Sequence, residues 1–71
     1  MNRNFIYKWG ETVRVSLAAP KESRPGKVCA VCGMRQAGDT NLYLVEFENG
    51  DSLEVPESWL QPNLERPGKS V

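Results

Sequence analysis

The segment from Tyr43 to Leu60 constrains the fold more than any other part of the chain, because it pairs two short alternating strands with a turn between them. In the first strand apolar and polar positions alternate, so one side can be buried; that side carries Tyr43, Val45 and Phe47. Asn49-Gly50 follows and is the preferred filler of a two-residue type I′ turn, since both central positions need a positive φ. The alternation then resumes. The segment therefore predicts a β-hairpin in an all-β protein.

Two more strands are predicted before this hairpin. Thr12–Leu17 alternates, with its valines and Leu17 on one side. Residues 27–35 carry apolar side chains on both faces, which is expected of a central strand, and Gly33 predicts a bulge or sharp bend within it. We expect exposed loops at residues 18–25 and 36–41. The aromatic segment Phe5–Trp9 is expected to pack, at least in part, against the body of the domain.

The end of the chain predicts one more element and a tail. Pro56–Leu60 suits a single helical turn, with Leu60 plugging one end of the core, and Gln61 and its neighbours can form a last short strand. From Pro62 onward, two prolines, a glycine and polar residues predict that 63–71 is a flexible tail. The predicted fold is a single all-β domain with its core at about residues 5–62: a small five-stranded barrel with one helical turn before the last strand.

Composition narrows the functional classes. The chain has no histidine and two cysteines, Cys29 and Cys32, three residues apart in a predicted strand. Side chains at that spacing point to opposite faces, and Cα atoms about 10 Å apart are too distant for a disulfide. A zinc site needs about four ligands, so we expect free thiols and neither a metal nor another cofactor. A thiol with no histidine or other adjacent base is a weak nucleophile. The sequence therefore favours a protein that is not an enzyme.

Targeting signals are not evident either. No apolar run approaches the roughly 18 residues of a membrane span, and the first residues lack the apolar core of a signal peptide. We expect a cytoplasmic protein that does not associate with a membrane.

The charge is balanced overall but unevenly placed. Residues 1–36 carry seven basic and two acidic groups, a net +5, whereas residues 37–71 carry two basic and seven acidic groups, a net −5. The charges can pair off within the fold as an ordinary soluble surface, or they can form two opposite patches that steer partners.

The order of the motifs resembles the SH3-like barrels, the group that includes KOW and Tudor domains. The similarity lies in Gly10-x-x-Val13-x-Val15, in Gly26-x-x-Cys29-x-Val31-x-Gly33, in Tyr43-x-Val45-x-Phe47-x-x-Gly50 and in the turn Pro56-Glu57-x-x-Leu60. It covers residues 10–60. Within this group the chain is similar to small free-standing bacterial proteins, including SH3-like immunity proteins of polymorphic toxin systems. This resemblance implies a five-stranded barrel, and a fold of this kind serves many unrelated functions.

A protein partner is the first functional hypothesis. Leu44 is an apolar residue on the side of its strand that should be exposed, and Trp9 and Trp59 each sit beside a turn signal, where they can either pack or act as interface anchors. An acidic surface could block a basic one by electrostatic complementarity, as an immunity-type inhibitor of a toxin would. The predicted protein-binding residues are Leu44, Glu46, Glu48, Asp51, Glu54, Glu57, Trp59 and Trp9.

Two alternatives stay open. KOW-like barrels bind nucleic acid through several cations on one surface, and the candidate residues are Lys21, Arg24, Lys27 and Arg35. The other alternative is a homo-oligomer that acts as an assembled ring, with subunit contacts through Leu44 and the N-terminal aromatic residues.

Overall fold

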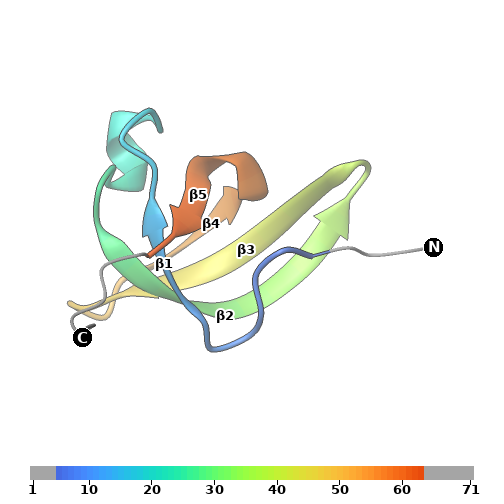
Figure 1. The fold of residues 1–71 in the computed structure, drawn as a ribbon, viewed down its shortest axis with the longest axis horizontal. Helices are drawn as coiled ribbons and strands as arrows, with labels where there is room; N and C mark the ends of the chain where they lie inside the picture. The colour runs from blue at the N-terminus through green and yellow to red at the C-terminus, as the bar shows by residue number, and fades with distance from the viewer. Residues whose placement is uncertain (1–4, 64–71) are drawn as a thin grey trace, which may run out of the picture.

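A computed structural model of the chain describes residues 5–63, and these form one antiparallel sheet of five strands with two short 3₁₀ turns (Figure 1). The sheet order is β4-β3-β2-β1-β5. The elements in chain order are β1 (Thr12–Val15), η1 (Lys21–Ser23), β2 (Val28–Ala37), β3 (Thr40–Phe47), β4 (Ser52–Pro56), η2 (Glu57–Trp59) and β5 (Leu60–Pro62). The prediction of an all-β chain with a helical turn directly before a short last strand is confirmed. The predicted tail lies outside the described residues, apart from Asn63.

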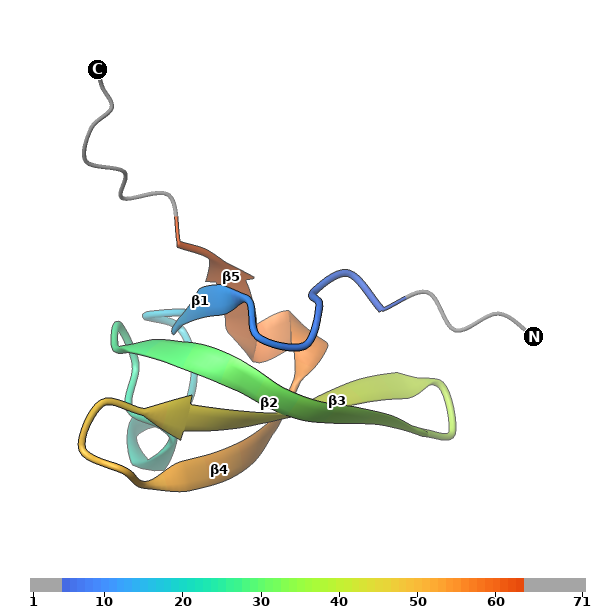
Figure 2. The same ribbon diagram turned by 90° about the horizontal axis from the view of Figure 1, so that it is seen from below.

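The core lies on one side of the sheet. Tyr43, Val45 and Phe47 are buried while the residues between them are exposed, so the alternation predicted for this strand is confirmed. Figure 2 shows β1 and β5 on one side of the long β2–β3 pair and β4 on the other side; β5 lies next to β1. The buried apolar side chains are those of Tyr7, Val13, Val15, Cys29, Val31, Tyr43, Val45, Phe47, Val55 and Leu60. The predicted burial of Leu60 is therefore correct.

The turn between β3 and β4 differs from the predicted type I′ turn. Gly50 has φ 95°, but Asn49 does not have a positive φ, as that turn would require. The N–H of Gly50 donates to the carbonyl of Phe47, and the N–H of Phe47 donates to the carbonyl of Asp51. This pattern is that of a three-residue loop, a type I turn closed by a glycine in the left-handed region. The Asn-Gly pair serves both turns, which is why the pair alone did not distinguish them.

The loop predicted at residues 36–41 is instead the tip of a long hairpin. Gln36 pairs with Asn41 and Ala37 with Thr40, which leaves only Gly38 and Asp39 as a two-residue turn. Gly38 has φ 62°, the positive value that the first position of a type II′ turn needs. Polar residues at exposed strand ends resemble a loop in sequence, because neither side of the hairpin tip is buried. The bulge predicted at Gly33 is confirmed, since the register shifts between Val31 and Gly33.

β1 is shorter than predicted and its apolar face ends early. The strand stops at Val15, and beyond it the N–H of Ser16 donates to the carbonyl of Trp59, on the side of β5. Leu17 is 80% exposed, not buried as expected. The following loop also contains an unpredicted turn, η1, in which Ser23 is buried and its hydroxyl donates to the carbonyl of Pro20. The central position predicted for β2 is confirmed, because it lies between β1 and β3.

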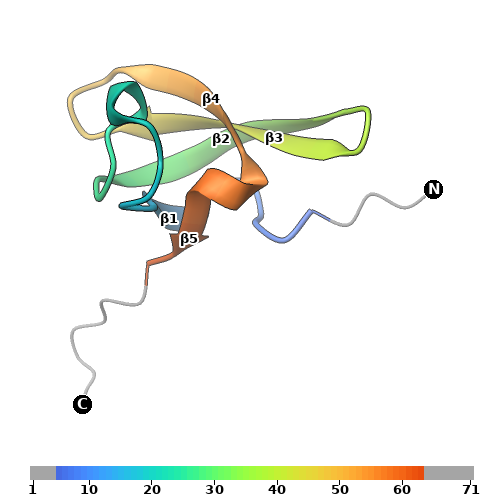
Figure 3. The same ribbon diagram turned by 90° about the horizontal axis from the view of Figure 1, so that it is seen from above.

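The N-terminal segment packs back through Tyr7 and Phe5, as predicted. Both rings make edge-on contacts with the ring of Tyr43, with centroids 5.5 and 5.8 Å apart. The Tyr43 hydroxyl accepts from the backbone N–H of Ile6 at 3.0 Å and donates to the carboxylate of Glu57 on η2. Burial, together with that carboxylate, raises the pKa of Tyr43 to about 12, so the hydroxyl keeps its proton at neutral pH. Figure 3 shows η2 and β5 close to β1; the Tyr7 hydroxyl donates to the carbonyl of Leu60 at the start of β5.

Candidate functional site

The side of the sheet that faces away from the core forms one continuous surface over β2 and β3. Alternation along each strand sends every second side chain to this side, and cross-strand pairing aligns Ala30 with Glu46 and Gly33 with Leu44. We call this surface the outer face; its residues are Val28, Ala30, Cys32, Leu44, Glu46 and Glu48, with Glu54 of β4 paired directly opposite Leu44. The outer face is hollowed beside β1, where an open depression of about 440 Å³ is lined by Thr12, Val28, Ala30, Glu46 and Glu48.

Apolar groups are exposed on this face. Leu44 is 40% exposed, and because Gly33 lies opposite it without a side chain, no neighbour on β2 covers it. A Cβ placed on Gly33 would meet the Cβ of Leu44 at 3.6 Å, an ordinary contact, so glycine is not required there by lack of space. Val28 is also exposed, although apolar residues on both faces of its strand suggested that it would be covered. β2 is central in the sheet but covered on one side only, which corrects the expectation that both of its faces pack.

Trp9 lies at the border of the same surface. Its indole Nε1–H donates to the carbonyl of Cys32 at 2.8 Å, while the residue as a whole is 72% exposed. This hydrogen bond fixes the ring beside the bulge, at the point where β1 stops covering β2. Of the two alternatives for Trp9, packing or exposure, the structure has the exposed one. Trp59 is partly buried and packs against the core, so it is not brought to the outer face.

The carboxylates predicted to bind a partner divide into two groups. Glu46 and Glu48 lie on the outer face, and neither forms an ion pair with a cation within residues 5–63. Glu54 also lies there, but its two oxygens accept from Nε and an Nη of Arg35 at 2.8 and 3.0 Å. This pairing lowers the pKa of Glu54 and raises that of Arg35. The negative charge of the outer face is therefore concentrated at Glu46 and Glu48.

Asp51 and Glu57 are held in other parts of the molecule. Asp51 accepts from the guanidinium of Arg24 and from the side chain of Asn49, and these contacts lower the pKa of Asp51. Glu57 accepts from the Tyr43 hydroxyl, from the N–H of Ile6 and from the Asn41 amide. Burial raises the pKa of Glu57, but these hydrogen bonds outweigh it and the net shift is downward. Both carboxylates have structural partners within the fold.

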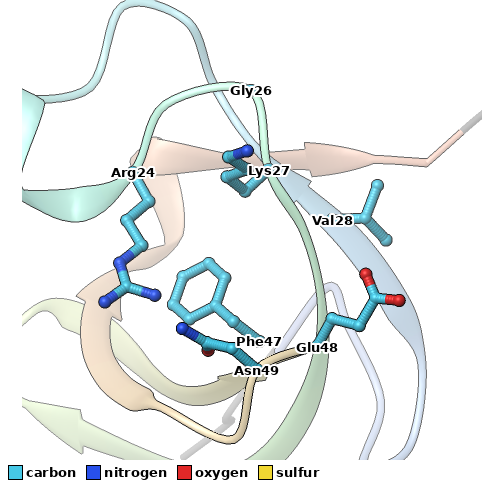
Figure 4. A pocket seen from close by; sticks show the side chains of 7 residues that line it. All are labelled: Arg24, Gly26, Lys27, Val28, Phe47, Glu48 and Asn49. Carbon is cyan, nitrogen blue, oxygen red and sulfur yellow. The ribbon is translucent and has the colours of Figure 1, made fainter.

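A second hollow of about 410 Å³ lies between the β1–β2 loop and the β3–β4 turn (Figure 4). Arg24 and Lys27 approach it from the loop, while Glu48 and Asn49 approach it from the turn. The guanidinium of Arg24 stands over the ring of Phe47 at 5.1 Å. Arg24 has φ 62°, the only positive φ of a non-glycine residue in the described part of the chain, and this residue caps η1. The Arg24 contacts tie the two loops together at this end of the sheet.

The cations proposed for nucleic-acid binding do not form one free surface. Lys21, Arg24 and Lys27 share the β1–β2 loop, but Arg35 lies far along β2 and pairs with Glu54. Arg24 pairs with Asp51. Only Lys21 and Lys27 of the four make no ion pair within residues 5–63, and phosphate binding gains affinity from several such contacts.

The two cysteines remain free, with Cys29 buried and Cys32 half-buried. Burial, with a smaller contribution from Cys32, raises the pKa of Cys29 to about 11. The pKa of Cys32 is also raised, by desolvation and by the Glu46 carboxylate, whose Oε1 lies 3.6 Å from its Sγ. Both groups are therefore thiols at neutral pH, and the thiolate is the nucleophile and metal ligand. Within residues 5–63 no group of three or more His, Cys, Asp or Glu side chains is placed to hold a metal ion.

Sequence reasoning missed three features of these surfaces. Leu17 and Ile6 are exposed apolar side chains away from the outer face, and Val28 is exposed on it. Val28 lies two residues before Ala30 and therefore on the same side of β2. The sequence would have placed Val28 correctly if that side of the strand had been expected to face solvent.

No helix among the described residues is long and apolar enough to cross a membrane. Comparison of the chain with family models, with curated proteins and with solved structures found no match.

Proposed function

We propose that this chain is a non-enzymatic binding protein that recognises a basic protein partner through its outer face. The observation that carries the proposal is the exposure of Trp9 and Leu44 beside Glu46, a carboxylate with no cation paired to it in residues 5–63. Exposed aromatic and aliphatic side chains are typical interface anchors, and an acidic rim favours association with a basic surface. The raised thiol pKa values and the lack of a histidine support the non-enzymatic part of the proposal.

The finer form of the proposal is an SH3-like barrel of the immunity type. The strand order β5-β1-β2-β3-β4, with a 3₁₀ turn directly before β5, supports the SH3-like part. In this form the partner is a bacterial toxin, and the outer face covers a basic surface on it. Only the resemblance and the acidic face support the toxin, so the binding function does not depend on it.

Affinity capture of the tagged full chain from its host lysate, with and without nuclease, tests the proposal. We expect one stoichiometric protein that survives nuclease. Its association rate should then be measured with Glu46→Lys plus Glu48→Lys, and with Glu22→Lys plus Asp39→Lys as a control of equal charge change. Glu22 and Asp39 lie on η1 and at the hairpin tip, away from the outer face.

We expect the double substitution on the outer face to lower the association rate at least tenfold and the control double substitution to change it little. The difference between the two should shrink in high salt. Equal effects of the two pairs would contradict a role for the outer face. A captured fraction made of nucleic acid or ribosomal proteins, lost on nuclease treatment, would favour the alternative based on Lys21 and Lys27.

A further inference from the structure

One edge of β2 is covered along half of its length and open along the other half. β1 pairs with Val28, Cys29 and Ala30, and the backbone of Val31 bonds to Gly10 and Glu11. The next acceptor, the carbonyl of Cys32, is taken by the Trp9 indole and not by a backbone group. Beyond it, residues 33–37 pair with β3 on one side and have no strand on the other side among residues 5–63.

Strand geometry identifies the backbone groups on this open edge. In a two-residue hairpin the residues that flank the turn, here Ala37 and Thr40, direct their N–H and C=O groups toward each other. These groups alternate in direction along the strand, so the N–H and C=O of Gln36 and Met34 point away from β3. The same alternation turns the Cys32 carbonyl outward, which agrees with its bond from Trp9.

Because of the bulge, the backbone groups that point away from β3 belong to odd-numbered residues before it and to even-numbered residues after it. Before it, the outward backbone groups belong to Val31, which bonds to Gly10 and Glu11. After the register shift they belong to the even-numbered residues. A strand that continued in line with β1 would thus meet Met34 and Gln36 with its own donors and acceptors.

This open edge lacks the devices that usually prevent pairing. Lysine, proline and charged side chains commonly guard sheet edges. Residues 33–37 contain neither lysine nor proline, and the one charge, Arg35, is engaged by Glu54 across the sheet. Trp9 stands at the start of the edge with most of its surface exposed, where it can pack on a side chain of an incoming segment.

We propose that the protein partner contributes an extended segment that pairs with Met34 and Gln36 as a sixth strand, in line with β1. Main-chain hydrogen bonds to β2 supply affinity in this mode, and packing on Trp9 supplies selectivity. The inference rests on the proposed function, because it specifies how a protein partner is held. In this arrangement the partner makes side-chain contacts on the outer face and main-chain hydrogen bonds at the border of that face.

The test uses the full chain and a phage-displayed library of random twelve-residue peptides as the probe. Selected peptides are measured against Gln36→Pro and Gln36→Ala. Both variants remove the side-chain bond from Gln36 to Asn41, but only proline removes the outward N–H. Proline is tolerated on an edge strand where its nitrogen faces solvent, so the domain should stay folded.

We expect peptides whose affinity falls about three- to tenfold in Gln36→Pro relative to Gln36→Ala, as the loss of one hydrogen bond predicts. A second measurement does not depend on the folding of the proline variant. Methylation of each backbone nitrogen of a selected peptide, one at a time, should weaken binding at every second residue. Loss without that two-residue period would contradict strand addition.

Other outcomes separate this inference from the proposed function. Failure to select any peptide, or selection of peptides lost in Leu44→Lys but equal in the two Gln36 variants, would overturn the edge site. The second of these outcomes would leave the outer face intact as a binding surface. A dimer of the chain in solution that Gln36→Pro abolishes would place a second copy on this edge, and would also overturn the proposal.

Discussion

The two sides of β3 alternate residue by residue along the strand, and they have opposite environments. Tyr43, Val45 and Phe47 are buried among the strands and the N-terminal segment. Leu44 and Glu46, between them in the sequence, face away from the core and touch little. A domain of 71 residues has few apolar side chains to spare for stability. An exposed leucine in the middle of a strand therefore supports the proposal that the outer side serves an interaction.

The comparison also separates two kinds of carboxylate. Glu57 receives hydrogen bonds from three groups and stabilises the attachment of the N-terminal segment. Within residues 5–63, Glu46 receives only a weak contact, from the Cys32 thiol. The fold thus divides acidic residues that are close together in the sequence into carboxylates with structural partners and carboxylates with no paired cation within residues 5–63.

Substitution on the inner, buried side of β3 should have the largest effect on stability. Tyr43→Ala removes a fully buried ring that contacts Phe5 and Tyr7, and such truncations cost about 3–5 kcal/mol. Leu44→Ala, one residue away on the outer side, should change stability by about 0.5 kcal/mol or less. Urea unfolding followed by tryptophan fluorescence measures both. Similar losses in the two variants would contradict the assignment of inner and outer sides.

Removing only the hydroxyl group of Tyr43 should have a smaller effect on stability. Tyr43→Phe keeps the ring but removes the hydroxyl that joins the Ile6 N–H to Glu57, so we expect a loss of about 1–2 kcal/mol. Amide exchange at Ile6 and Tyr7, measured by NMR, should accelerate much more than exchange at Val45. Uniform acceleration through the sheet would mean that the hydroxyl does not specifically hold the N-terminal segment.

Two glycines extend the comparison to the backbone. Gly50 has φ 95°, so Gly50→Ala should cost about 1–2 kcal/mol although nothing crowds the new methyl group. Gly33→Ala places a methyl group at ordinary contact distance from Leu44 and should cost about 0.5 kcal/mol or less. Thermal unfolding of both variants checks the order. If Gly33→Ala were the more damaging substitution, the outer face would be more tightly packed than described.

The smallest effect concerns pH. The pKa of Glu57 is lower in the folded chain than in the unfolded chain, so its contribution to stability is present above the unfolded pKa, about 4.3, and is lost as pH falls through the folded value. The stability of the natural chain should therefore fall more steeply below about pH 4.5 than that of Glu57→Gln. Asp51 and Glu54 shift in the same direction and remain in both proteins. Parallel pH profiles would show that the Glu57 contacts are not retained in solution.

The sequence predicted the elements that depend on burial. Period-two patterns located β3, β4 and the inner face of β2, and a glycine in a strand located the bulge. These features follow from local alternation, which the core must satisfy wherever the strands pair.

Features that depend on which elements come together were not predictable in the same way. The type of the β3–β4 turn, the length of the β2–β3 hairpin and the end of β1 are set by pairing between distant segments. The charge partners Arg24–Asp51 and Arg35–Glu54 join residues 27 and 19 positions apart. Because such pairs depend on the full fold, the sequence did not show that three of the proposed protein-binding residues, Asp51, Glu57 and Trp59, lie away from the outer face.

The central claim, that the outer side of β3 serves an interaction and not the stability of the fold, is tested most directly by two exposed leucines. The dissociation constant of the captured partner should be measured for Leu44→Lys and for Leu17→Lys, with the unfolding free energy of both variants determined on the same samples. Leu17 is exposed in the β1–β2 loop and away from the outer face, so it controls for the added charge. We predict binding at least tenfold weaker in Leu44→Lys alone, with both variants as stable as the natural chain to within about 0.5 kcal/mol. Equal binding by the two variants would contradict the account.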